Sequence, residues 1–340
     1  MQIIRQRAYC RAGLVGNPSD GYHGKTISII IRNYFAEVIL YEWERIELLL
    51  SQDDQSHFDS IRDLAKDVEL HGYYGGIRLV KATVKKFVEF CDQERMRGRP
   101  GFELHQRKFS IRYESNVPRQ VGLAGSSAII VATLRALMDF YQVDILRHIQ
   151  PSLVLSVETA ELGIAAGLQD RVIQVYEGLV YMDFAKEQFA SESGYEFGVY
   201  EPLDASLLPP LYVAFCTDVG EPTEVFHNPL RALYEQGDEQ IVNAMHDFAS
   251  YAEQARQAIL DQDAQSLGKL IDQNFDTRNS ICQLPPQQIQ LVEAARQVGA
   301  SAKFAGSGGA IIGTYEDEAM FERLVQQLGR LGCKVIKPRI

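Results

Sequence analysis

Residues 118–128 read Pro-Arg-Gln-Val-Gly-Leu-Ala-Gly-Ser-Ser-Ala, and this stretch decides the fold. It lies between the alternating segment 109–113, which predicts a strand, and the apolar run 129–141, which predicts a helix. Glycines at such a turn let backbone amides approach a ligand closely, and the helix start adds unpaired N–H donors and a positive dipole end. The stretch therefore predicts a phosphate-binding loop, in which a serine hydroxyl of the first turn reaches a metal ion.

A plainer interpretation of the same loop stays open at this point. Glycine-rich turns before helices are common, and either Ser126 or Ser127 can serve only as a helix N-cap. The stretch is not a Walker loop either, because no Gly-Lys-Ser/Thr follows its glycines. The rest of the chain has to decide between the two interpretations.

Composition places the chain among ordinary globular proteins and excludes several kinds of partner. The 340 residues are 46% hydrophobic and 23% charged, which is enough chain for two lobes with a core each. The net charge of −11 and the lack of a Lys/Arg-rich run argue against nucleic acid and against an anionic membrane surface. No apolar run has the length of a membrane span, and the N-terminus has no signal-peptide pattern.

The cysteines are odd in number, scattered and without Cys-x-x-Cys spacing, which predicts reduced thiols and neither a zinc site nor a disulfide framework. They are Cys10, Cys91, Cys216, Cys282 and Cys333. We expect a cytoplasmic protein.

The N-terminal segment surrounds a polar turn at residues 16–24. Strands are predicted at 9–14, 27–31 and 35–41, the last two as a hairpin-like unit. Loops of this composition are usually plain turns. Polar groups on a rigidly mounted loop are also candidates for ligand contact. Four such residues lie in or beside this turn: Arg11, Asp20, His23 and Lys25.

A pair of carboxylates follows the central helix. The segment 152–164 has a helical pattern and carries Glu158; a turn broken by glycines then leads to Gln169, Asp170 and Arg171 before a strand at 178–184. Two acidic groups twelve residues apart are most often surface charge. If the turn folds them to one site they suit phosphoryl transfer, which uses one carboxylate on the metal and one near the attacking hydroxyl.

The remaining segments complete a two-lobed α+β prediction. Residues 72–76 break a weak pattern at 60–70 and place Tyr73 and Tyr74 between glycines, either against a purine base or packed within their own loop. Periodicity is lost at 186–208, so we expect lobes at 1–195 and 196–340. The second lobe is predicted to contain strands at 211–216 and 334–336, helices at 238–260, 264–275, 286–298 and 317–331, and a glycine-rich turn within 303–313.

Three stretches together resemble the GHMP kinases, the family of galactokinase, homoserine kinase and mevalonate kinase. They are the N-terminal strand and turn at 11–24, the Pro-x-x-x-Gly-Leu-Ala-Gly-Ser-Ser-Ala loop at 118–128, and the turn at 303–313. They occur in the family's order and span nearly the whole chain. The third motif, Gly-Ser-Gly-Gly-Ala at 306–310, has fewer glycines than is usual. The resemblance implies an N-terminal α/β lobe, a C-terminal ferredoxin-like lobe, and ATP with Mg²⁺ between them.

The resemblance also implies a role for individual residues. Asp170 takes the proton from the attacking hydroxyl, with Arg11 and Lys25 beside it, and Ser127 and Glu158 hold the metal. The substrate is expected against Asp20, Gln169 and Arg171. ATP is expected against the second and third motifs, at Pro118, Gly122, Leu123, Ala124, Gly125, Ser126, Ser127, Ala128, Gly306, Ser307 and Gly308.

Within the family the likeness is greatest to sugar-1-kinases that act on D-glucuronate, on the evidence of residues 16–28, 72–76, 118–129 and 166–172. A uronic acid needs a local cation, for which Arg171 and Arg119 are candidates. Kinases of heptose and fucose share the Gln-Asp pair. They are alternatives, together with kinases of galactose type and a sensor that binds sugar and nucleotide without turnover. A mevalonate-like substrate is disfavoured, because those kinases usually carry Ser-Gly before the aspartate.

Overall fold

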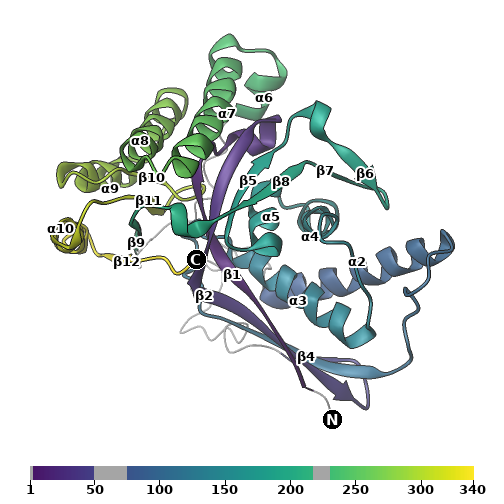
Figure 1. The fold of residues 1–340 in the computed structure, drawn as a ribbon. Helices are drawn as coiled ribbons and strands as arrows, with labels where there is room; N and C mark the ends of the chain where they lie inside the picture. Colours follow the sequence, from purple (N-terminus) through teal and green to yellow (C-terminus); the bar gives the residue numbers. More distant parts are fainter. Residues whose placement is uncertain (1–2, 50–74, 217–229) are drawn as a thin grey trace, which may run out of the picture.

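Two long antiparallel strands, β1 (Ile3–Val15) and β2 (Lys25–Trp43), form the centre of the first lobe in the computed structural model, which describes residues 3–49, 75–216 and 230–340 (Figure 1). Tyr9 pairs with Phe35 and Cys10 with Ile31, so residues 32–34 bulge from β2. The predicted hairpin-like unit at 27–41 is therefore wrong. It is one continuous strand, because residues 26–31 are buried on both faces and the chain does not turn back at the bulge.

The other edge of β2 is shared by two strands. β4 (Lys108–Ser115) pairs with its second half and β5 (Leu179–Asp183) with its first. β3 (Glu47–Leu48) and β8 (Val199–Leu203) continue the sheet beyond them, and β6 (Ala190–Glu192) and β7 (Tyr195–Phe197) form a small separate ribbon. The 186–208 segment, expected to be irregular, thus adds a strand to the first sheet.

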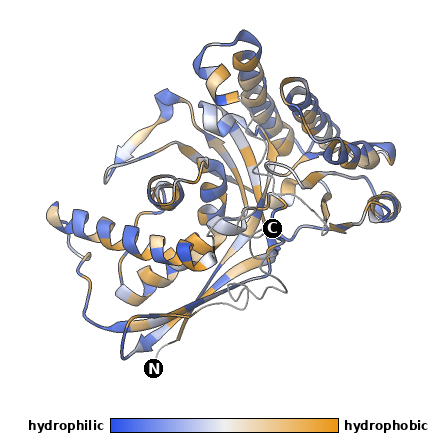
Figure 2. Cartoon of the chain, turned by 180° about the vertical axis from the view of Figure 1, so that it is seen from behind, coloured by the Kyte–Doolittle hydropathy of each residue, from blue (hydrophilic) through white to orange (hydrophobic). Residues whose placement is uncertain are grey.

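Helices lie on one face of this sheet and bury an apolar core against it (Figures 1 and 2). They are α2 (Gly76–Met96), α3 (Gly125–Tyr141), α4 (Gln150–Ser156) and α5 (Leu168–Tyr176). The helix predicted at 129–141 is confirmed. The helix predicted at 152–164 is shorter: α4 runs into a π-helical turn, Val157–Glu161, which carries Glu158.

The second lobe has the predicted ferredoxin-like topology. Its antiparallel sheet has the order β10-β11-β9-β12, which is the spatial order of a βαββαβ unit. The strands are β9 (Leu211–Cys216), β10 (Lys303–Phe304), β11 (Ala310–Thr314) and β12 (Cys333–Ile336). The helices are α6 (Leu230–Glu235), α7 (Glu239–Leu260), α8 (Ala264–Ile281), α9 (Pro286–Gln297) and α10 (Glu318–Gly329).

The lobes share a core on the face of the first sheet opposite α3. Ile27 and Ile29 of β2 join Val213 and Phe215 of β9 and Ile271 of α8 in one buried cluster. Because β8 still pairs with the first sheet and β9 begins the second, we propose a lobe boundary between residues 203 and 211. The shared core holds the glycine-rich turns of the two lobes against one another.

The cysteine prediction is wrong in one respect. Cys216 and Cys333 form a disulfide, because β9 and β12 are neighbours and place the two residues opposite each other, 117 residues apart in sequence. Cys10, Cys91 and Cys282 are buried thiols.

Two further observations complete the fold. None of the helices in the described ranges is both long and apolar enough to cross a bilayer. The predictions for 60–70 and for Tyr73 and Tyr74 fall outside the described residues.

Candidate active site

The glycine-rich loop at 118–128 enters the N-terminus of α3, as predicted. The first intrahelical hydrogen bond runs from the Ala128 N–H to the Ala124 carbonyl, at 3.3 Å. The amides of residues 125–127 are therefore those that a helix start leaves without an intrahelical acceptor. Ser127 is buried and its hydroxyl donates back to the Ala124 carbonyl at 3.3 Å, whereas Ser126 is exposed. The loop presents a donor surface suited to an anion.

A glutamine that the sequence did not single out fixes the shape of this loop. Ala124 has a left-handed backbone (φ 60°), which is uncommon for a residue with a side chain. The buried Gln174 of α5 donates from Nε2 to the Ala124 carbonyl at 2.8 Å and to the Tyr9 carbonyl at 3.1 Å. α5 and β1 thus hold the loop in place.

The two glycine-rich turns touch, which confirms that the second and third motifs meet between the lobes. A Cβ atom added to Gly122 would lie 2.6 Å from the Gly308 carbonyl oxygen, and one added to Gly306 would lie 2.4 Å from the Gly122 carbonyl oxygen. Side chains at these positions would push the turns apart. The glycines are therefore required for the backbones to approach.

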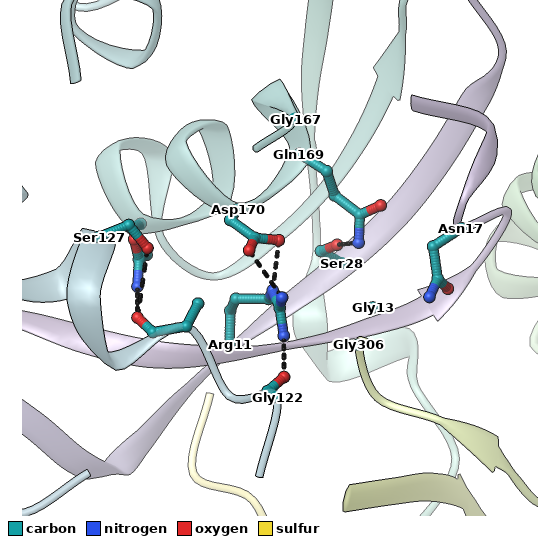
Figure 3. Close-up of polar contacts among 12 residues, drawn as sticks. Arg11, Gly13, Asn17, Ser28, Gly122, Ser127, Gly167, Gln169, Asp170 and Gly306 are labelled. Carbon is teal, nitrogen blue, oxygen red and sulfur yellow. Dashed lines mark hydrogen bonds and ion pairs between the residues drawn. The ribbon is translucent and has the colours of Figure 1, made fainter. Parts of the chain in front are cut away.

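Arg11 joins three parts of the site (Figure 3). From β1 its Nε and Nη2 donate to the two carboxylate oxygens of Asp170 at 2.5 and 2.7 Å. Its Nη1 donates to the Gly122 carbonyl at 2.6 Å and to the Ala305 carbonyl at 3.4 Å. The side chain is buried. One guanidinium thus connects the acidic residue expected to be the base with both glycine-rich loops.

The electrostatics of Asp170 keep it ionised. Burial favours its neutral form, but the charges of Arg11 and Arg171 and the hydrogen bonds from Arg11 outweigh burial and lower the pKa of Asp170 below its ordinary value. The group is a carboxylate at neutral pH. It can orient a hydroxyl and accept its proton only as negative charge develops on the substrate oxygen.

Asp20 lies against the start of α5, whose N-cap position is Gly167. A Cβ added to Gly167 would lie 2.4 Å from Asp20 Oδ2, and the nearby Gln169 backbone N–H partly stabilises the carboxylate. Gly167 has no side chain to cap the helix, and Asp20 supplies that acceptor from the N-terminal turn. Burial, reinforced by the charge of Asp170, raises the pKa of Asp20 to about 6. The structure thus brings the predicted Asp20, Gln169 and Asp170 together.

Glu158 and Arg171 form a buried pair. Arg171 donates from Nε to Glu158 Oε2 at 2.7 Å and also from Nη2 to the same oxygen, and its Nη1 donates to the Gly167 carbonyl at 2.8 Å. Burial raises the pKa of Glu158, an effect partly offset by Arg171. Because these contacts occupy its guanidinium, we do not retain Arg171 as the cation that meets a substrate.

Lys25 lies among other carboxylates. Its Nζ is 3.7 Å from Asp183 Oδ2 and 3.2 Å from Glu253 Oε1. Lys25 lies at the start of β2, where it pairs with Asp183 at the end of β5, and Glu253 belongs to α7. The resemblance implies a place for Lys25 beside Asp170, but the ion-pair contacts of its Nζ in the described residues are with Asp183 and Glu253. We leave Lys25 out of the proposed site.

Buried polar residues tie the N-terminal turn to the second lobe. Lys303 of β10 donates from Nζ to the Gly13 and Phe304 carbonyls, each at 2.8 Å, and to the Asn17 side-chain oxygen. Asn274 of α8 accepts from the Gly16 N–H at 2.6 Å and donates to the Asn17 carbonyl at 3.0 Å. Neither Asn17 nor Asn274 was predicted from the sequence. They position the turn that carries Asp20.

Gln169 extends this polar layer into the first sheet, where its Nε2 donates to the Ser28 hydroxyl at 2.9 Å (Figure 3). A Cβ on Gly13 would lie 2.6 Å from the same Nε2 atom, so glycine is needed for the close approach. Gln169 therefore fixes the backbone beside Asp170 and Asp20.

The residues present fit a magnesium ion held jointly with nucleotide phosphates. No cluster of three or more His, Cys, Asp or Glu suited to a metal occurs among the described residues. Ser127 offers a hydroxyl. Glu158 offers Oε1, which accepts no hydrogen bond from the described side chains, since both Arg171 bonds go to Oε2. Hydroxyl and carboxylate oxygens are the ligands that Mg²⁺ prefers, with phosphate oxygens completing its shell.

Two protein-family models match segments of the chain. The model of the GHMP kinases N terminal domain matches residues 78–178, and that of the GHMP kinases C terminal matches residues 255–332. The first covers the phosphate-binding loop and Asp170, and the second covers the third motif.

Relatives match most of the chain. Glucuronokinase 1 of Arabidopsis thaliana is 43% identical over 316 residues, 91% of this chain and 84% of that protein. Probable glucuronokinase 2 of the same plant is 40% identical over 99% of this chain and 91% of its own length. A solved structure of Lactococcus lactis galactokinase with galactose superimposes with a TM-score of 0.74 at 15% identity, covering 100% of this chain and 94% of that one.

Proposed function

The chain belongs to the GHMP kinase family and is an ATP-dependent sugar kinase, and we propose that it phosphorylates the anomeric hydroxyl of D-glucuronate to give glucuronate 1-phosphate. The choice of sugar is supported by identity of 43% and 40% to two relatives named as glucuronokinases. The proposed reaction needs no covalent intermediate on the protein. It needs alignment of the two substrates and neutralisation of charge.

The observation that carries the proposed chemistry is the position of Arg11. It binds Asp170 through two hydrogen bonds and the Gly122 carbonyl through a third. A carboxylate is thereby held beside the loop whose amides face an anion. A sugar hydroxyl that hydrogen-bonds Asp170 would lie next to the terminal phosphate of a nucleotide on that loop, which is the arrangement for in-line transfer.

In this proposal each residue has a defined role. The amides of residues 125–127 bind phosphate oxygens, and Arg11 adds positive charge where negative charge accumulates. Ser127 Oγ and Glu158 Oε1 would hold Mg²⁺, which neutralises phosphate charge when bound. Asp170 orients the hydroxyl and takes its proton late, because its lowered pKa makes it a weak base.

A substrate panel with an active-site variant tests the proposal. Wild-type protein and Asp170→Asn are assayed with ATP, Mg²⁺ and free sugars or uronic acids, and ADP release is measured. We expect turnover of glucuronate in the wild type and a loss of about 10²–10⁴-fold in the variant, because the amide keeps the size of the side chain but not its basicity. Nucleotide affinity should change little. A wild type that ignores every uronic acid but uses a neutral sugar would contradict the choice of substrate.

A further inference from the structure

A uronic acid brings a carboxylate into the site, so a cation must be available to receive it. Most cations near Asp20 and Asp170 already have partners. Arg11 is bound to Asp170, Arg171 to Glu158, and Lys303 Nζ has three oxygen acceptors. An ammonium has three donors, so Lys303 has none left for a ligand.

Arg278 is different. It lies in the last turn of α8 and is partly buried, and its side chain reaches the third glycine-rich turn. Nη1 donates to the Gly306 carbonyl at 2.7 Å and Nη2 to the Ser307 carbonyl at 3.1 Å. Nε is buried and has no nitrogen or oxygen acceptor among the described residues, and the Cys282 thiol lies close to the guanidinium. Within the described ranges no carboxylate lies within ion-pair distance of this guanidinium.

Among the described residues, Arg278 has no direct ion-pair partner. Burial lowers the pKa of Arg278 from its ordinary value, with a partial offset from Cys282 and from Asp20. Lys303 is destabilised as a cation by burial and by the charges of Arg278 and Arg11. The charges of Arg278 and Arg11 thus both act on Lys303, which indicates that these three cationic side chains lie near one another. A partly buried cation with no carboxylate beside it in the described ranges is costly, and an anionic ligand lowers that cost.

The position of Arg278 indicates which anion it would bind. Against the effect of burial, the charge of Asp20 raises the pKa of Arg278, and Asp20 lies near Asp170 at the start of α5. Arg278 reaches this region from the second lobe through Gly306, whose carbonyl it binds; a Cβ added to Gly306 would lie 2.9 Å from Nη1 of Arg11, the residue that binds Asp170. A sugar with its anomeric hydroxyl at Asp170 would extend toward Arg278 with the end that carries the carboxylate.

We propose that Arg278 is the residue that selects a uronic acid over the neutral sugar, by receiving the substrate carboxylate between the two lobes. The inference rests on the proposed function. A guanidinium suits this role because it is planar, always charged and able to bind a carboxylate through two N–H groups. Its hydrogen bonds to the Gly306 and Ser307 carbonyls orient the fork in advance.

The test compares a charged and an uncharged substrate of the same shape. KM and kcat are measured for D-glucuronate and D-glucuronamide at saturating ATP and Mg²⁺, in wild type and Arg278→Gln. We expect KM for glucuronate to rise about 30-fold, which corresponds to about 2 kcal/mol. KM for the amide and both kcat values should stay within about twofold, because a contact made equally in ground and transition states affects binding only.

Two further variants separate this role from loss of structure. Arg278→Lys keeps the charge and should recover part of the preference for glucuronate. Arg323→Gln removes a charge from an exposed position on α10 of the same lobe and should behave as wild type. If Arg278→Gln does not fold, the Lys variant still decides, since it should lose affinity for glucuronate and not for the amide.

Other outcomes overturn the inference in distinguishable ways. A fall in kcat of equal size with both substrates would assign Arg278 to the phosphoryl group. Unchanged kinetics with both would make it a structural brace of the third turn. In either case a wild type active on glucuronate leaves the proposed function standing. A wild type that uses only neutral sugars would contradict both the role of Arg278 and the proposed function.

Discussion

Replacing Arg11 with glutamine should destabilise the protein in a way that depends on pH. The substitution removes the charge and the two hydrogen bonds to Asp170, at 2.5 and 2.7 Å. Removing one partner of a buried ion pair costs about 3–5 kcal/mol. Because the Asp170 side chain keeps 22% of its exposure, we expect the lower end, about 3 kcal/mol at neutral pH. That is a large part of the stability of a typical domain.

The sign of the pH dependence follows from Asp170. In the wild type its pKa is lowered, so the pair stabilises the fold above the ordinary carboxyl pKa of about 4 and loses this contribution as the pH falls through the lower native value. In Arg11→Gln the burial of Asp170 is opposed only by Arg171, so its pKa rises. The variant should therefore lose stability as the pH increases from about 5 to about 8.

Urea unfolding of both proteins at about pH 5 and about pH 8 measures this difference. We expect the stability deficit of Arg11→Gln to be larger at the higher pH. Adding Asp170→Asn should restore part of the stability, because the double variant has no unpaired buried charge. A deficit that is equal at both pH values, or a double variant less stable than Arg11→Gln, would refute the account of the pair.

Three other variants test separate parts of the site. Glu158→Gln should raise the Mg²⁺ concentration for half-maximal turnover by about tenfold and also lower stability, because it discharges the partner of Arg171; an unchanged magnesium titration would remove Glu158 from the metal site. In the wild type, protonation of Asp20 should lower kcat/KM for the sugar below about pH 6, and Asp20→Asn should abolish this decline. A decline of kcat/KM that persists in the variant would assign the pH dependence to another group. Lys303→Met should lower the free energy of unfolding by about 2–4 kcal/mol, since three buried oxygens lose their donor, whereas Lys269→Met at an exposed position should change it by less than about 0.5 kcal/mol; equal effects would contradict the buried network.

The parts of the fold set by local pattern could be predicted from the sequence. The phosphate-binding loop, α3 and the second-lobe helices follow from glycine positions and apolar periodicity, which act over a few residues. The bulge that joins two predicted strands into β2 was missed because the signal at residues 32–34 is the same for a bulge as for a turn. The disulfide between Cys216 and Cys333 depends on strand pairing, which no local pattern encodes.

For the same reason, only part of the candidate site could be predicted from the sequence. Asp20, Gln169 and Asp170 could be named because they lie in motifs. Arg278 and Gln174 act through a single side chain reaching a distant backbone, and nothing near them in sequence marks that reach. The catalytic role of Lys25 stays a prediction, since its Nζ lies within ion-pair distance of Asp183 and Glu253.

The most direct test of the proposed reaction is to identify the product formed from D-glucuronate, ATP and Mg²⁺. Phosphorus-coupled NMR of the purified product distinguishes phosphate on the anomeric carbon from phosphate on any other. The arrangement of Asp170 beside the Gly122 loop in a sugar-1-kinase predicts a single product with phosphorus coupled to the anomeric proton. Phosphate on another hydroxyl, or ADP release without a phosphorylated sugar, would contradict it.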